Sequence, residues 1–199
     1  MSSSSAAALR VAVIALVTVF VALPAAAAWE LDGQRSTVSF ISVKNASIAE
    51  VHHFRALSGS VGDDGQVQLA IDLDSVETLV PIRNQRMREL LFETVRFPAA
   101  TLEAAVDPQL LAVAVGETRR AALDLALDLH GRRVDYTVEA LVTGGADGSV
   151  QVSLAQPLIV RAADFGLEAG VEILREVAGL KSISTAVPVD ARLVFSPLR

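Results

Sequence analysis

The sequence predicts a mainly β fold, a small antiparallel barrel or sandwich with a helix across one end. Much of the chain alternates apolar and polar residues with period two, which places successive side chains on opposite faces of a strand. Residues 75–98 interrupt that pattern with a strand end, an Arg-Asn pair, a short amphipathic stretch and a Phe-Pro stop. This order favours a barrel whose mouth is crossed by the short helix.

The strands are marked by their alternating apolar residues. We expect a last strand over residues 183–195, after four clear alternating stretches. The apolar members of these four are Val38 and Phe40; Val67, Leu69, Ile71 and Leu73; Leu123, Leu125, Leu127 and Leu129; and Val134, Tyr136, Val138 and Ala140. Each strand therefore has one apolar and one polar face, which is typical of antiparallel rather than parallel sheets.

Glycine-rich turns separate these strands. Residues 62–65 read Gly-Asp-Asp-Gly, and residues 144–148 form a longer glycine-containing loop. Residues 129–132 predict a tight hairpin, because Gly131 can adopt a positive φ. Short strands joined by such turns indicate a barrel or a sandwich.

Two stretches have helical spacing instead. Within residues 84–92, one helical face is formed by Met87, Leu90 and Leu91. Asn84 is expected to cap the start of this helix, and Pro98 prevents its continuation. Apolar residues also repeat at helical spacing in residues 170–180, where Gly179 supplies a C-terminal stop.

The N-terminus has the order of a secretory signal peptide, which predicts export to the periplasm. Within residues 1–28, Arg10 is followed by an apolar run over residues 11–23 and then by an alanine tract. The run is short for a bilayer span of about 20 residues, although an uncleaved anchor is the alternative. Cleavage would leave one domain, residues 29–199, with no later apolar run long enough for a stable transmembrane span.

Composition excludes several classes of function. The chain has no cysteine, so neither disulfides nor thiolate metal sites hold the exported fold. Its formal net charge is −6, which disfavours nucleic acid and broad attraction to anionic membranes. Aromatic residues make up 5% of the chain, too few for an aromatic carbohydrate groove.

Several short motifs are spread over nearly all of residues 29–199. They are Trp29-Glu30-Leu31-Asp32, Ser36-Thr37-Val38-Ser39-Phe40, residues 53–61, Ser75, Thr78, Arg83-Asn84, Leu91-Phe92 and Phe97-Pro98. Together they resemble the YceI-like family of exported, lipocalin-like proteins. The resemblance implies an eight-stranded antiparallel barrel that holds an isoprenoid or acyl chain in its lumen and has no catalytic motif. The chain departs from the family pattern at three places. It has Arg83-Asn84 where the family usually has Arg-Asp, and Arg86 where a residue with a basic ring often follows that pair. Its segment over residues 164–180 is also longer.

Candidate ligand-binding residues fall into a wall group and a mouth group. The wall candidates, each equally readable as ordinary core, are Phe40, Phe54, Leu69, Ile71, Leu125, Leu127 and Tyr136. The mouth candidates, which either line a cavity or plug the barrel end, are Met87, Leu90, Leu91, Phe92 and Phe97. Arg83, beside Asn84, is the first of three arginines that form either a cationic collar for an anionic head group or a solvated helix face.

The remaining polar residues carry no recognisable chemistry. His52 and His53 point to opposite faces of a strand, His130 lies in a predicted turn, and no His-Glu-x-x-His or Gly-x-Ser-x-Gly motif exists. We therefore expect no metal, no cofactor and no catalytic residue.

The preferred function is an exported carrier of a polyisoprenoid or fatty-acyl chain. The alternatives are a structural or stress-related envelope protein and, less favoured, a lipid-acting enzyme that uses His53 or His130; a homodimer is left open.

Overall fold

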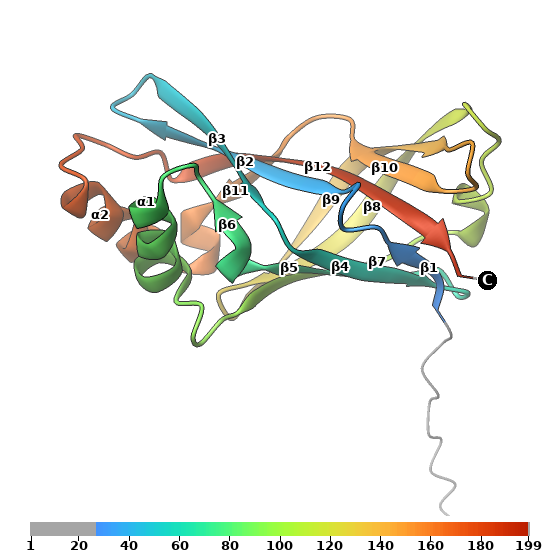
Figure 1. Cartoon of the computed structure of the whole chain (residues 1–199), viewed down its shortest axis with the longest axis horizontal. Coiled ribbons are helices and arrows are strands. Elements are labelled where there is room, and N and C mark those ends of the chain that lie inside the picture. The colour runs from blue at the N-terminus through green and yellow to red at the C-terminus, as the bar shows by residue number, and fades with distance from the viewer. Residues whose placement is uncertain (1–26, 199) are drawn as a thin grey trace, which may run out of the picture.

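The computed structural model describes residues 27–198, and these form a closed barrel of eight antiparallel strands (Figure 1). Around the ring, the strands are β1 (Ala27–Leu31), β4 (Leu57–Gly62), β5 (Gln66–Asp72), β7 (Ala99–Ala105), β8 (Thr118–Leu129), β9 (Arg132–Gly144), β10 (Val150–Leu154) and β12 (Ala186–Pro197). The ring closes because β12 pairs with both β10 and β1. The prediction of an eight-stranded antiparallel barrel is confirmed.

Four further strands lengthen the wall at one end. They are β2 (Thr37–Lys44), β3 (Ile48–Phe54), β6 (Val76–Glu77) and β11 (Leu158–Arg161). Residues 192–197 of β12 pair with β1 and β10, whereas residues 186–192 pair with β11 and β2. The single strand β12 therefore runs through both halves of the wall.

The predicted turns are present. The β4–β5 connection covers residues 63–65, and residues 145–149 join β9 to β10. In the β8–β9 hairpin, His130 and Gly131 have φ values of 53° and 74°. Two successive positive φ angles are typical of a type I′ turn, whose twist matches that of the strands.

The first helix starts earlier than expected. Helix α1 (Pro81–Arg86) runs directly into a π-helical turn, η2 (Met87–Phe92). Proline is favoured at the first helical position because its missing N–H has no intrahelical acceptor there. The prediction that Asn84 caps this helix is wrong: Asn84 is buried within it, and its Oδ1 accepts a 2.8 Å hydrogen bond from the backbone N–H of Thr78.

The second helix, α2 (Glu168–Val177), confirms the other helical prediction. Its C-terminal end is followed by Gly179, which has a φ of 64°. Three short 3₁₀ turns complete the structure: η1 (Leu73–Ser75), η3 (Pro108–Leu110) and η4 (Ala162–Phe165). Helices α1 and α2 lie together at one end of the barrel, hereafter the helical end, and β1 lies toward the other (Figure 1). No helix within residues 27–198 is long and apolar enough to cross a bilayer.

The expected signal peptide, residues 1–28, lies almost entirely outside the described residues. Residues 27 and 28 belong to β1, and the Ala28 carbonyl accepts a 2.9 Å hydrogen bond from the Leu198 N–H. The structure thus describes a strand that begins two residues before the expected domain boundary, and cleavage near Trp29 stays a prediction.

Buried side chains are concentrated at the two ends of the barrel. One cluster, toward β1, contains Leu31, Val61, Leu69, Leu111, Val142, Val150 and Phe195. A second, at the helical end, contains Phe40, Leu73, Val76, Met87, Phe92 and Ala100, and a third contains Ala162, Phe165 and Leu167. Between the two ends, the leucines of β8 face inward and yet are only half-buried. The middle of the barrel is therefore not filled by its own side chains.

Candidate functional site: an apolar cavity inside the barrel

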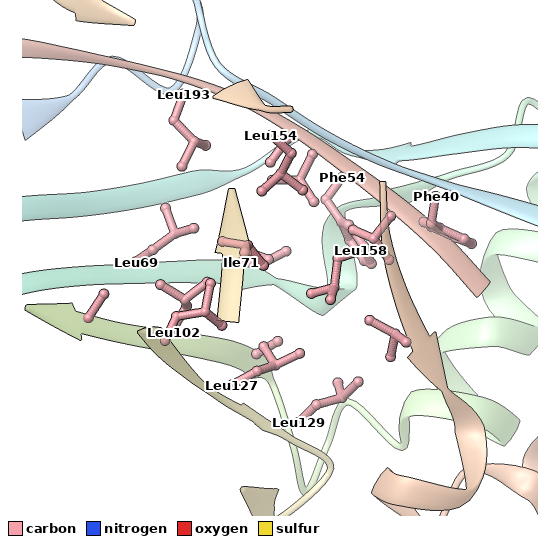
Figure 2. Close-up of a pocket in the computed structure, with 18 of the residues that line it drawn as sticks. Phe40, Phe54, Leu69, Ile71, Leu102, Leu127, Leu129, Leu154, Leu158 and Leu193 are labelled. Atoms are coloured by element: carbon pink, nitrogen blue, oxygen red, sulfur yellow. The ribbon is translucent and has the colours of Figure 1, made fainter. Parts of the chain in front are cut away.

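A cavity of about 270 Å³ occupies the interior of the barrel (Figure 2). Its wall includes Phe40, Phe54, Leu69, Ile71, Leu102, Leu127, Leu129, Leu154, Leu158 and Leu193. Among the described residues, 27–198, Ser153 is the only one in the lining that carries a polar side chain. Such a wall offers almost no hydrogen-bonding group and favours a hydrocarbon occupant.

Alternation in the strands explains why this wall is apolar, and small residues explain why it is hollow. On β8, the inward positions are Leu123, Leu125, Leu127 and Leu129, whereas polar residues such as Asp124 face outward. Several inward positions on other elements carry only a methyl group, namely Ala100, Ala104, Ala140, Ala162 and Ala191. An eight-stranded barrel has just enough interior for side chains to fill, so alanines at these positions leave space.

The helical end supplies part of the wall. Met87, Leu91 and Phe92 of η2 line the cavity, as does Val171 of α2. The two segments lie in direct contact: a Cβ on Gly170 would stand 2.7 Å from the carbonyl oxygen of Leu90. Only glycine permits this approach of α2 to η2. Together, α2 and η2 form a cover over the helical end of the cavity.

Nine of the fourteen expected binding residues line the cavity. They are Phe40, Phe54, Leu69, Ile71, Met87, Leu91, Phe92, Leu125 and Leu127. Lining residues that the sequence reasoning did not single out include Val61, Leu102, Leu129, Leu154, Leu158, Leu167 and the β12 residues Val187, Val189, Ala191 and Leu193. The β12 residues alternate with period two, so the signal that marked β8 was also present there.

The other five expected residues lie outside the cavity wall. Leu90 is half-buried in η2, and the ring of Phe97 packs against His130 with centroids 4.4 Å apart. Tyr136 packs under η4 against the cluster that contains Phe165. Within the described chain, its hydroxyl is buried without a hydrogen-bond partner, and burial raises the pKa of Tyr136. The remaining two, Arg83 and Asn84, belong to a polar cluster.

That polar cluster connects α1 to the β2–β3 hairpin. Arg83 donates a 2.6 Å hydrogen bond to Glu50 Oε2 and a 2.8 Å bond to the Thr78 carbonyl. Lys44 Nζ lies 2.7 Å from the same Glu50 oxygen. Lys44 first, and then Arg83, hold the pKa of the Glu50 carboxyl below its usual range. The Arg83 charge is therefore partly neutralised by the fold rather than free at the cavity.

His52 lies between this polar cluster and the apolar wall. Its side chain is 2% exposed, its Nε2 lies 2.8 Å from Ser42 Oγ, and its ring centroid is 5.2 Å from that of Phe40. Burial lowers the pKa of His52 to about 4. The imidazole is consequently neutral at pH 7, so Phe40 packs against an uncharged ring, tilted by 58° to its own.

A closed eight-stranded antiparallel barrel around an apolar interior defines a lipocalin-like protein. The family model for the YceI-like domain matches residues 29–195, so the chain belongs to the YceI-like family, as the sequence motifs indicated. No curated protein matches the chain. Within residues 27–198, no three His, Cys, Asp or Glu side chains are grouped so that they could hold a metal ion.

Solved structures share this barrel. A polyisoprenoid-binding domain from Saccharophagus degradans, implicated in plant cell wall breakdown, is 39% identical, with a TM-score of 0.85 over 87% of this chain and 100% of that one. BcnA from Burkholderia cenocepacia is 18% identical, with a TM-score of 0.65 over 82% and 98% of the two chains. The YceI protein of Campylobacter jejuni is 16% identical, with a TM-score of 0.56 over 79% and 90%. The last two show the fold alone.

Proposed function

We propose that this protein is an exported, non-catalytic lipid carrier that encloses one polyisoprenoid or fatty-acyl chain in the barrel. The observation that carries the proposal is the cavity wall, to which the described part of the chain contributes a single polar side chain, that of Ser153. The polyisoprenoid-binding domain that is 39% identical supports the choice of ligand class.

Burial of hydrocarbon supplies the binding free energy in this proposal. Each methylene moved from water into the cavity contributes about 0.8 kcal/mol. An unbranched or isoprenoid chain is slender enough to lie along an eight-stranded barrel. The walls hold it by contact with methyl groups, and they select for apolar length rather than for a particular functional group.

We place the entrance at the helical end. There the cover consists of α2 and η2, whereas a cluster of buried side chains, including Leu31, Val61 and Phe195, fills the opposite end. Helices that rest on a barrel rim move with less disruption than strands that share a hydrogen-bonded ladder. The polar head of the ligand would then remain near the entrance.

Export fits the same proposal. The signal-like order of residues 1–28 and the lack of cysteine agree with a periplasmic protein. An apolar chain in the periplasm has to cross water, and an enclosed cavity shields it during that passage. Amino-terminal sequencing or intact-mass analysis of protein from the periplasmic fraction would find cleavage near Trp29 if this part is right.

Mass spectrometry of organic extracts tests lipid binding. Protein purified without detergent should release a long-chain lipid in near-stoichiometric amount. The variant Leu125→Trp adds an indole inside the cavity and should carry much less lipid. Ala122→Trp adds the same group on the exposed face of β8 and should carry as much as the native protein.

Two outcomes would favour the alternatives. Lipid-free native protein that captures defined envelope proteins in a pull-down would indicate a structural or stress-related role. Turnover of a lipid that His53→Ala or His130→Ala abolishes would indicate an enzyme. Equal lipid content in Leu125→Trp and the native protein would contradict enclosure in the barrel.

A further inference from the structure

Exposed apolar side chains are gathered on the connection between β6 and α1 and in the first turn of α1. Leu79 is 82% exposed, Ile82 52% and Val80 40%. Single exposed apolar residues are ordinary on a protein surface, but several adjacent ones indicate an interaction site. The rest of α1 joins these three to η2, whose side chains line the cavity at the helical end.

The backbone holds Leu79 in this exposed position at a conformational cost. Leu79 has a φ of 63°, in the left-handed region that is unfavourable for a residue with a side chain. Because its side chain is mostly in water, burial does not offset that cost within the described chain. Strain that burial of the side chain does not offset is a mark of a functional segment.

Hydrogen bonds keep the strained connection in place. The Leu79 N–H donates to Glu77 Oε1 at 2.5 Å, and Asn84 Nδ2 donates to the same oxygen at 3.1 Å. The Thr78 N–H donates to Asn84 Oδ1, and Arg83 donates to the Thr78 carbonyl. The connection is therefore a rigid platform that presents Leu79 outward.

The charge of this segment is opposite to that of the protein. The whole chain has a formal charge of −6, but residues 79–88 contain three arginines and no acid. Arg83 is paired with Glu50, whereas Arg86 and Arg88 make no carboxylate ion pair within residues 27–198. Each of these two instead donates to a backbone carbonyl, of Val177 and Asp74 respectively.

The neighbouring groups define the edge of this surface. Val177, at the end of α2, is 44% exposed and lies beside Arg86 through the 3.3 Å bond to its carbonyl. The next acid along the chain, Glu89, accepts a hydrogen bond from Gln85. We call Leu79, Val80, Ile82, Arg86 and Arg88 the Leu79 surface.

We propose that the Leu79 surface docks on an anionic phospholipid bilayer. The three apolar side chains enter the boundary between head groups and acyl chains, and the two arginines bind lipid phosphates. Apolar residues flanked by basic ones are the composition of interfacial membrane anchors. The acidic remainder of the protein opposes the contact, which makes it reversible and sensitive to salt.

This docking would set the helical end of the cavity against the membrane. The Leu79 surface continues directly into η2, which covers that end. The inference does not depend on what the cavity holds, since the docking contacts are all on the outer surface. Docking would give a lipid a route between the membrane and the cavity that does not pass through water.

Vesicle flotation tests the proposal with the purified full chain. Native protein should float with vesicles of phosphatidylglycerol and phosphatidylethanolamine at low salt, and weakly with phosphatidylcholine alone. The double variant Leu79→Ser/Ile82→Ser should bind at least about tenfold more weakly, because two apolar insertions are lost. Arg86→Gln/Arg88→Gln should abolish the preference for anionic vesicles and most of the salt dependence.

The control is Val115→Ser. Val115 is 68% exposed on the β7–β8 connection and carries the same kind of exposed apolar side chain away from the helical end. It should bind as the native protein does. Circular dichroism should show the native fold in every variant, since the altered side chains are at least partly exposed.

Three results would overturn the proposal. The first is native protein that stays unbound at every vesicle composition. The second is Leu79→Ser/Ile82→Ser protein that binds as well as native, and the third is a loss of binding in Val115→Ser as large as in that double variant. Light scattering supplies a fourth: a native dimer that Leu79→Ser/Ile82→Ser converts to a monomer would show that a second copy, not a membrane, covers this surface.

Discussion

The buried histidine at the helical end predicts a defined acid sensitivity of the fold. His52 is 2% exposed, and burial lowers its pKa from 6.5 to about 4. In the unfolded chain the imidazole is solvated and titrates near its ordinary value of about 6.5. Between pH 6.5 and about 4, His52 therefore binds a proton in the unfolded chain but stays neutral in the folded protein.

The sign and size of the effect follow from this difference. Above pH 6.5 the imidazole is neutral in both states, and His52 does not make stability depend on pH. Between pH 6.5 and about 4, protonation stabilises the unfolded state alone, so the free energy of unfolding falls as the pH falls. Each pKa unit is worth about 1.4 kcal/mol, which limits the total loss to about 3 kcal/mol.

Urea unfolding at half-unit pH steps from 7.5 to about 4.5 measures this loss. His52→Gln keeps a hydrogen-bonding group near Ser42 but cannot titrate. Its stability should be lower than native at pH 7.5, and the difference between the two proteins should shrink as the pH falls. His53→Gln, at a half-buried position, is the matched control and should retain the native pH dependence. Parallel pH profiles for native and His52→Gln would refute the reasoning.

Three other changes test particular contacts. Gly170→Ala should lower Tm by several degrees and accelerate lipid exchange, because the new Cβ would stand 2.7 Å from the Leu90 carbonyl and push α2 off η2; calorimetry and a fluorescent-lipid release assay measure the two effects. Asn84→Ala should cost about 1–3 kcal/mol in urea unfolding, since it leaves the buried N–H of Thr78 without an acceptor. Leu79→Gly should leave stability unchanged or raise it by up to about 1 kcal/mol, because glycine tolerates the φ of 63°; a clear loss of stability would show that the leucine side chain is packed rather than displayed.

The wall of the barrel was readable from the sequence because alternation assigns each strand residue to a face. Leu125 and Leu127 were placed correctly on the inner face by their neighbours alone. Alternation does not say whether an inner face meets a void or another side chain. Tyr136 follows the same pattern as Val138 and yet lies under η4, because Phe165, 29 residues later, packs against it.

Polar partners were harder to predict because they come from outside the helix that carries Arg83 and Asn84. Arg83 resembled a free cation on a short helix, but its carboxylate partner, Glu50, is 33 residues earlier. Asn84 resembled a helix cap, but its side chain accepts a hydrogen bond from Thr78, in the strained connection that precedes the helix. The Arg83 contact depends on how the β2–β3 hairpin meets α1, and the Asn84 contacts depend on how residues 77–78 pack against α1. Periodicity along the helix encodes neither.

The long strand β12 has a consequence for how the chain reaches its folded state. It joins residue 29 to residue 197 through the pairing of Trp29 with Pro197, and it also contributes to the opposite half of the wall. No shorter piece of the chain can seal the cylinder, and contacts so distant in sequence form slowly. If the chain is exported as we propose, its barrel would stay open until the last strand left the translocation pore.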